Sequence, residues 1–123
     1  MNIANWIIGP QLIGFILLLV GLMQTYFPPK KINNLYGYRT SSSMKNQQMW
    51  DEANRYSARY SVWVGLIILL IGIAITAALK IIMLPIKIKI ALDVLAIIAP
   101  GLISMALVIA MTERHLEKFE KNK

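Results

Sequence analysis

Residues 60–79 read YSVWVGLIILLIGIAITAAL, and none of these twenty side chains carries a charge. Leucine, isoleucine and valine fill more than half of the positions, without the alternation of apolar and polar residues that marks a half-exposed helix or strand. A helix rises about 1.5 Å per residue, so twenty residues cover roughly the 30 Å hydrocarbon core of a bilayer. This stretch therefore predicts a membrane-spanning helix.

Two similar blocks lie on either side of it. Residues 1–29 contain no charged side chain, and residues 90–112 contain one, Asp93. The three blocks predict an all-α, integral membrane three-helix bundle with spans at about residues 8–27, 61–79 and 90–111. In this single transmembrane domain of residues 1–123, the rest is a motif loop with a loop helix, residues 28–60, and a charged tail, residues 112–123.

The first block shares its position with a secretory signal peptide. Signal peptides have a basic beginning and a small-residue cleavage site. Here Asn2 and Asn5 stand in place of basic residues, and the block ends in aromatic residues followed by Pro28-Pro29. We expect this segment to be retained as the first span.

Proline and hydroxyl residues predict where the helices begin and end. Pro10 suits the first turn of a helix, and Pro28-Pro29 would stop that helix. The hydroxyl run at residues 40–43 supplies N-cap candidates for a helix that begins near Met44. Because residues 44–64 contain no glycine or proline, we expect that helix to run unbroken into the second span.

A short connection is predicted at residues 80–90. Its Ile-Lys alternation at residues 86–90 resembles a strand but is too short to form a sheet alone. The charged segment at residues 113–123 is predicted to be helical.

The distribution of basic residues predicts the orientation in the membrane. The formal net charge is +7, which attraction to anionic lipid headgroups explains, so nucleic acid is not an expected partner. Ten basic residues lie in the first loop and the tail, and three, Lys80, Lys87 and Lys89, lie on the opposite side. Loops rich in lysine and arginine stay in the cytoplasm. We therefore expect a cytoplasmic loop and C-terminus, with the N-terminus outside.

Small and polar residues gather on one face of each predicted span when residues are placed at 100° intervals. The three faces consist of Gln11, Gly14, Leu18, Gly21 and Thr25; Ser61, Gly65, Gly72 and Thr76; and Asp93, Pro100, Ser104 and Met111. Such faces mark helix–helix contacts in lipid. The pattern predicts plain packing of the bundle, and leaves open a polar internal crevice or a homo-oligomer interface.

The loop carries a motif of aromatic, amide and basic residues. Its members are Asn33, Tyr36, Gly37, Tyr38, Arg39, Thr40, Trp50 and Asn54. With the three-span arrangement, this order resembles the SdpI family of bacterial membrane proteins, named for the immunity protein against a secreted sporulation-delaying toxin. The resemblance implies a multi-pass protein of the bacterial cytoplasmic membrane with a role in toxin immunity or signal transduction.

The chemistry of the motif indicates a structured loop. Gly37 permits a turn with positive φ, and Arg39 offers a planar fork for a carboxylate or a lipid phosphate. We expect Asn33 and Asn54 to cross-link the loop to the helix, and Arg39 and Trp50 to stabilise that contact. Two other interpretations remain open: a solvated loop, and a site for a ligand or partner.

Few residues offer catalytic or metal-binding chemistry. Asp93 is the sole charge within a predicted span, which fits either a structural role or the handling of a proton or ligand. His115 has no second histidine or cysteine to complete a zinc site. Asp51 and Glu52 are adjacent, so they point apart on a helix and form no acid/base pair. We expect no enzymatic activity and no cofactor or metal.

These observations favour a binding function. The expected partners are membrane lipids, a membrane-active toxin peptide and a membrane or cytoplasmic protein. The alternative is a small oligomeric channel or transporter that uses the polar helix faces, with Gln11, Asp93 and Ser104 as its intramembrane polar residues.

Overall fold

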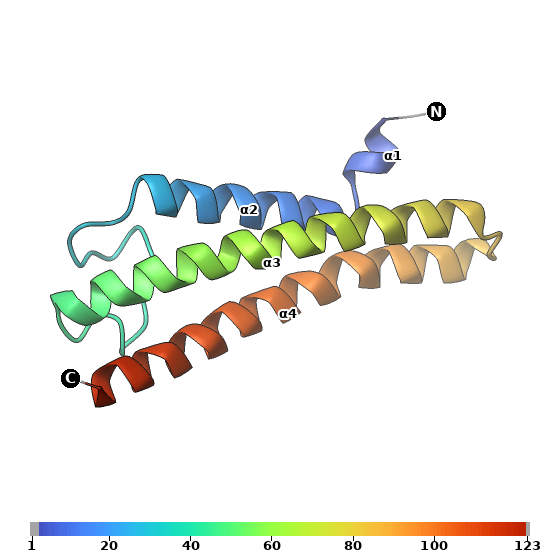
Figure 1. Cartoon of the computed structure of the whole chain (residues 1–123). Helices are drawn as coiled ribbons and strands as arrows, with labels where there is room; N and C mark the ends of the chain where they lie inside the picture. Colours follow the sequence, from blue (N-terminus) through green and yellow to red (C-terminus); the bar gives the residue numbers. More distant parts are fainter. Residues whose placement is uncertain (1–2, 123) are drawn as a thin grey trace.

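All regular secondary structure in the computed structural model, which describes residues 3–122, is α-helical. The helices are α1 (Ala4–Ile7), α2 (Pro10–Tyr26), α3 (Gln47–Ile81) and α4 (Ile86–Lys121). Figure 1 shows α2, α3 and α4 running lengthwise beside one another, with α1 standing off at one end. We call the end that holds residues 27–46 and the C-terminus the loop end, and the end with the α3–α4 connection the turn end.

Two helices are long enough and apolar enough to cross a membrane. They are α3, with 35 residues, and α4, with 36. Their outward faces are apolar: Leu70 is 62% exposed and Leu102 is 65% exposed. A continuous apolar surface of this kind suits lipid and not water. The third apolar helix, α2, has 17 residues, which span roughly 26 Å.

The first apolar block is not one helix. Helical structure is interrupted at Ile8 and Gly9, and this interruption separates the single turn of α1 from α2. The prediction that the main helix begins at Pro10 and ends before Pro28 is confirmed.

The start of α3 differs from the prediction. The helix begins at Gln47 instead of near Met44, and its N-cap is Asn46, whose side-chain oxygen accepts a hydrogen bond from the Met49 amide at 2.9 Å. The prediction that the hydroxyl run caps this helix was wrong, because Thr40 and Ser43 bond to each other and Thr40 also donates to Glu113 of α4. From Gln47 the helix runs unbroken to Ile81, as predicted.

The α3–α4 connection is shorter than predicted. Residues 82–85 form it, and the Ile-Lys alternation belongs to the first turns of α4. A helix satisfies its backbone hydrogen bonds locally, whereas a lone strand has no partner for them. At the other end α4 continues to Lys121, so the prediction of a helical tail is confirmed over that range.

Glycine brings the backbones of α2 and α3 into contact. A Cβ atom added to Gly65 would lie 2.6 Å from the Leu18 nitrogen, and one added to Gly21 would lie 2.8 Å from the Val62 nitrogen. Real Cβ atoms do not approach backbone so closely. The small-residue faces predicted for these helices are therefore used for packing within one chain.

The buried apolar side chains are concentrated at the loop end. Met49, Ala53 and Leu116 form the buried apolar cluster, and Tyr38 and Phe119 pack against it. Further along α4 towards the turn end, Ser104 is the only buried residue among residues 86–111. Apolar burial stabilises a fold in water and not in lipid, which fits a core outside the apolar stretches.

The glycine contact yields a stability prediction. We expect Gly65→Ala to lower the free energy of unfolding in detergent by about 1–3 kcal/mol, because its methyl group would push two backbones apart. Gly101→Ala is the matched control on α4, since the nearest atom to its added Cβ would be Ile13 Cδ1 at 3.9 Å. Thermal unfolding followed by circular dichroism measures both. Equal melting temperatures for the two variants would contradict the close α2–α3 contact.

Candidate functional site

Trp50 and Asn54 of α3 hold the loop against the bundle. Trp50 is fully buried, and its indole nitrogen donates to the Pro29 carbonyl at 2.7 Å. The Asn54 side-chain oxygen accepts from the Tyr38 amide at 2.6 Å, while its nitrogen donates to the Trp50 carbonyl at 2.9 Å. The loop therefore folds back onto α3 at two points along its length.

Gly37 is required at this contact for two reasons. Its φ of 109° lies in the region that L side chains rarely adopt. A Cβ atom there would also lie 2.5 Å from the Asn54 side-chain oxygen and 2.7 Å from Pro29 Cγ. The positive φ follows the prediction, but the lack of space beside Asn54 depends on tertiary structure.

Asn33 and Arg39 act within the loop and do not reach the helices. The Asn33 side-chain oxygen accepts from the amides of Leu35 and Tyr36, at 2.9 and 2.7 Å. Arg39 is exposed and donates to the Asn34 carbonyl. The prediction that Asn33 cross-links the loop to α3 was wrong, because a short amide side chain finds its nearest donors in its own turn. Arg39 bonds to the backbone of the loop itself, and its effect on stability stays a prediction.

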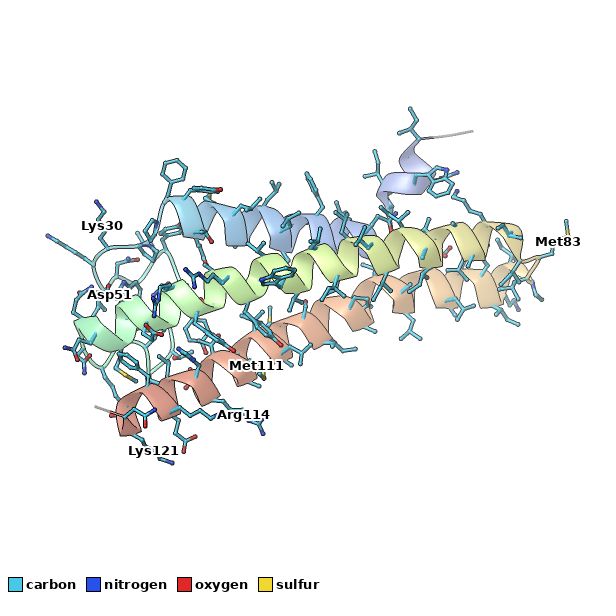
Figure 2. The ribbon with its side chains drawn as sticks, viewed as in Figure 1. Lys30, Asp51, Met83, Met111, Arg114 and Lys121 are labelled. Atoms are coloured by element: carbon cyan, nitrogen blue, oxygen red, sulfur yellow. The ribbon has the colours of Figure 1, made fainter. Side chains whose placement is uncertain are left out.

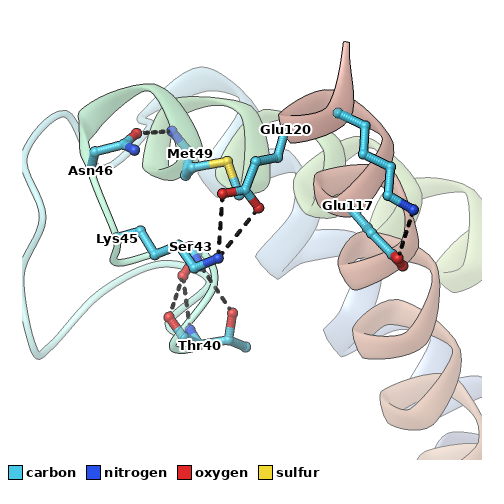
Figure 3. Close-up of polar contacts among 8 residues, drawn as sticks. Thr40, Ser43, Lys45, Asn46, Met49, Glu117 and Glu120 are labelled. Atoms are coloured by element: carbon cyan, nitrogen blue, oxygen red, sulfur yellow. Dashed lines mark hydrogen bonds and ion pairs between the residues drawn. The ribbon is translucent and has the colours of Figure 1, made fainter. Parts of the chain in front are cut away.

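The hydroxyl run closes a turn and meets α4. The Thr40 amide donates to Ser43 Oγ at 2.8 Å, and the Ser43 amide donates to Thr40 Oγ1 at 3.2 Å. Figure 3 shows this reciprocal pair beside Lys45, which pairs with Glu120 of α4 at 3.3 Å. The Thr40 hydroxyl donates to Glu113 at 2.7 Å, so the turn is fixed to α4.

Glu113 receives a second hydrogen bond from the motif, from the Tyr38 hydroxyl at 2.7 Å. Partial burial opposes ionisation of Glu113, but the hydrogen bonds from Thr40, Tyr38 and Ser42 outweigh it and lower the pKa of the carboxyl. Burial and the bond to Glu113 raise the pKa of the Tyr38 phenol. Tyr38 thus remains a donor and Glu113 a charged acceptor. Sequence reasoning missed Glu113, although it is the first charge after the third apolar block.

A second cluster joins α3 to α4 at the same end. The His115 ring nitrogen Nε2 lies 2.6 Å from Glu52 Oε1, and the His115 ring stacks on Tyr56 at 4.1 Å between centroids. Partial burial disfavours the Glu52 carboxylate, but hydrogen bonds from His115 and Arg55 lower its pKa. Asp51 instead accepts from Gln47, so the adjacent acids do point apart as predicted.

The intramembrane polar residues do not form one site. Gln11 is buried, accepts from the Thr76 hydroxyl at 2.8 Å and donates to the Trp6 carbonyl. Ser104 donates to the Gly101 carbonyl of its own helix at 2.9 Å. Asp93 is exposed near the turn end and lines a pocket of about 280 Å³ with Lys80 and Lys89.

An apolar groove of about 340 Å³ lies between α2 and α4. Its walls are Ile13, Ile16, Leu17 and Val20 of α2, and Gly101, Ser104, Met105, Val108 and Ile109 of α4. Tyr38 of the loop also lines the groove. The same tyrosine therefore touches the groove with its side chain and Glu113 with its hydroxyl.

Two apolar helices of membrane-spanning length, with a loop fastened across their polar ends, define an α-helical membrane protein. Comparison with known proteins makes the assignment specific. The chain belongs to the SdpI/YfhL protein family, whose sequence pattern matches residues 30–112. The matched range includes the whole loop motif, α3 and most of α4, so the resemblance seen in the sequence is confirmed.

One curated relative is the protein YfhL of Bacillus subtilis (strain 168). It is 44% identical over 71 residues, which cover 58% of this chain and 64% of the relative. The match thus spans less than two thirds of the relative's length. No solved structure matches this chain.

The buried indole gives a test of the loop contact. We expect Trp50→Ala to lower the free energy of unfolding by about 3–5 kcal/mol, because it leaves a cavity and removes the bond to Pro29. Trp63→Ala is the matched control, since Trp63 lies on the same helix and is 66% exposed. Chemical unfolding in detergent measures both. A similar loss in the two variants would show that the loop is not docked through Trp50.

Proposed function

We propose that this protein binds a membrane-active peptide and acts by binding, without catalysis, in toxin immunity or sensing. The observation that carries the proposal is the double role of Tyr38, which lines the apolar groove and also donates to Glu113. An occupant of the groove would contact a residue of the family motif directly. The family itself is named for an immunity protein, which supports the same function.

The groove has the chemistry that an apolar peptide segment needs. Its lining is almost entirely aliphatic, and the hydroxyl of Ser104 is already bonded to its own helix. Gly101 leaves room for a Cβ atom, which would lie in ordinary van der Waals contact with Ile13 Cδ1 at 3.9 Å. Small residues of this kind let another helix approach closely in lipid.

The same contacts suggest how binding would be sensed. An occupant that displaces the Tyr38 ring would break its bond to Glu113 and loosen the loop from α4. Arg39 is exposed on this loop, with the rest of its guanidinium beyond the Asn34 bond open to a carboxylate. In the proposed mechanism, a cytoplasmic partner reads the loop through such contacts, and the peptide shifts the population of the docked state.

The proposal places the loop end in the cytoplasm, with α2 as a third span and the N-terminus outside, in the bacterial cytoplasmic membrane. The ten-to-three distribution of basic residues supports this orientation. Single cysteines at Asn5 and Lys121 test it by labelling of intact cells with an impermeant reagent. We expect labelling at position 5 only; labelling at position 121 only would reverse the orientation.

A channel or transporter is the second candidate, and the pocket beside Asp93 favours it. Asp93 shares that pocket with Lys80, Lys89 and Thr76 near the turn end. Against it, the polar faces of α2 and α3 are occupied by their mutual contact, where Gln11 bonds to Thr76. This function would depend on the Asp93 carboxylate, whereas peptide binding would not.

Protection of a sensitive bacterium from membrane-active peptides tests the proposal. We expect the wild-type protein to protect and Gly101→Leu to abolish protection, because the added side chain fills the groove. Ala106→Leu is the matched control, since Ala106 is exposed on the same helix and does not line the groove. Survival is measured against a peptide panel at matched expression, with membrane potential followed by a dye.

Asp93→Asn separates the two candidate functions. We expect this variant to protect as well as the wild type. Loss of an ion flux in Asp93→Asn, with no peptide that discriminates the wild type from Gly101→Leu, would replace the binding function by the channel or transporter.

A further inference from the structure

A second pocket, of about 550 Å³, lies at the loop end between the end of α2 and the first turns of α3. Gln24, Thr25 and residues 28–30 line one side, and the other side consists of Asp51, Asn54, Arg55, Ala58 and Arg59. Figure 2 shows Lys30 and Asp51 together at this end of the molecule. This pocket is separate from the apolar groove and from the contact between the loop motif and Glu113.

The lining carries an excess of positive charge. Lys30, Arg55 and Arg59 face a single acid, Asp51, which already accepts from Gln47 at 2.7 Å. Arg55 is paired with Glu52. Within residues 3–122, no hydrogen bond or ion pair engages the side chains of Lys30 and Arg59. Two uncompensated cations at one pocket favour an anion.

Arg55 and Arg59 share one face of α3 with apolar side chains. At 100° per residue, Leu66, Leu70 and Ile73 lie on the same side of the helix as Arg55 and Arg59. These three apolar side chains are 37%, 62% and 46% exposed. From Arg59 to Leu70 the helix rises roughly 16 Å, about half of the ~30 Å hydrocarbon core. The basic and apolar parts thus match the headgroup and the acyl chains of one lipid leaflet.

We propose that this pocket binds the phosphodiester headgroup of an anionic phospholipid, with the acyl chains along Leu66, Leu70 and Ile73. The Arg59 guanidinium presents two parallel N–H donors, which fit two phosphate oxygens. The Lys30 ammonium supplies a second charge from the opposite wall. The backbone of Lys30 is held against α3, because its carbonyl accepts a hydrogen bond from the Gln47 side chain at 2.6 Å.

Quenching of Trp63 fluorescence by lipids with brominated acyl chains tests the site. Trp63 lies one turn beyond Arg59 and is 66% exposed. A Trp6→Phe background removes the indole near the turn end, and the third tryptophan, Trp50, is fully buried against the loop. Brominated phosphatidylglycerol and phosphatidylcholine are titrated separately into the full chain in mild detergent. We expect phosphatidylglycerol to quench at about 30-fold lower mole fraction, as two cations near a membrane surface predict.

Paired double variants locate the effect. Lys30→Gln/Arg59→Gln should bring phosphatidylglycerol quenching to the phosphatidylcholine level. Lys31→Gln/Arg114→Gln removes the same charge at the same end outside the pocket, and should leave the preference unchanged. Circular dichroism confirms folding. If the pocket variant does not fold, the lipid preference of the wild-type protein decides the test. Equal quenching by phosphatidylglycerol and phosphatidylcholine then overturns the proposal.

Two further outcomes would also overturn it. An equal loss in both double variants would indicate a diffuse field of positive charge without a site. Displacement of phosphatidylglycerol by millimolar inorganic phosphate or glycerol phosphate would indicate a site for a soluble anion. We expect neither soluble anion to compete, because neither occupies the apolar face of α3.

Discussion

The backbone contact between α2 and α3 is the constraint on which the rest of this structure depends. Lipid gives apolar helices little reason to associate, so the contact relies on close approach, which Gly14, Gly21, Gly65 and Gly72 permit. That contact fixes the axial position of α2 along α3. As a result, Pro29, just beyond the end of α2, lies beside the Trp50 indole. Tyr38 in the loop that follows bonds to Asn54 and Glu113. The loop motif can therefore dock only when α2 and α3 are already packed in this register.

The two ends of the bundle are stabilised by different physics. At the loop end, water makes burial of Met49 and Leu116 favourable, and the polar groups of the loop are paired with Glu113 and Asn54. Through the apolar stretches there is almost no buried side chain on α4. This leaves α4 fastened mainly by its last turns, and leaves the groove beside α2 open. The groove is therefore a consequence of where the core can form.

Much of the fold follows from composition and periodicity, whereas the contacts of the loop do not. The charge-free blocks predict the long helices, since only their length and polarity matter, and the 100° periodicity finds the glycine face. The N-cap, the Ile-Lys segment and Asn33 were mispredicted, because each has two local solutions that tertiary packing or nearby donors decide. Glu113 was missed for a related reason: its partners, Tyr38 and Thr40, lie more than seventy residues away in the sequence.

The groove and the basic pocket are served by one loop. Tyr38 lines the groove, while Pro29 and Lys30 line the pocket. Adjacent turns of α3 hold both segments: Asn54 accepts from the Tyr38 amide, and the Trp50 indole donates to the Pro29 carbonyl. The Asn54 side chain also donates to the Trp50 carbonyl. The Trp50–Asn54 contact offers a route for coupling between the two proposed sites, and such coupling would be reciprocal, since each ligand would bias the same docked state of the loop.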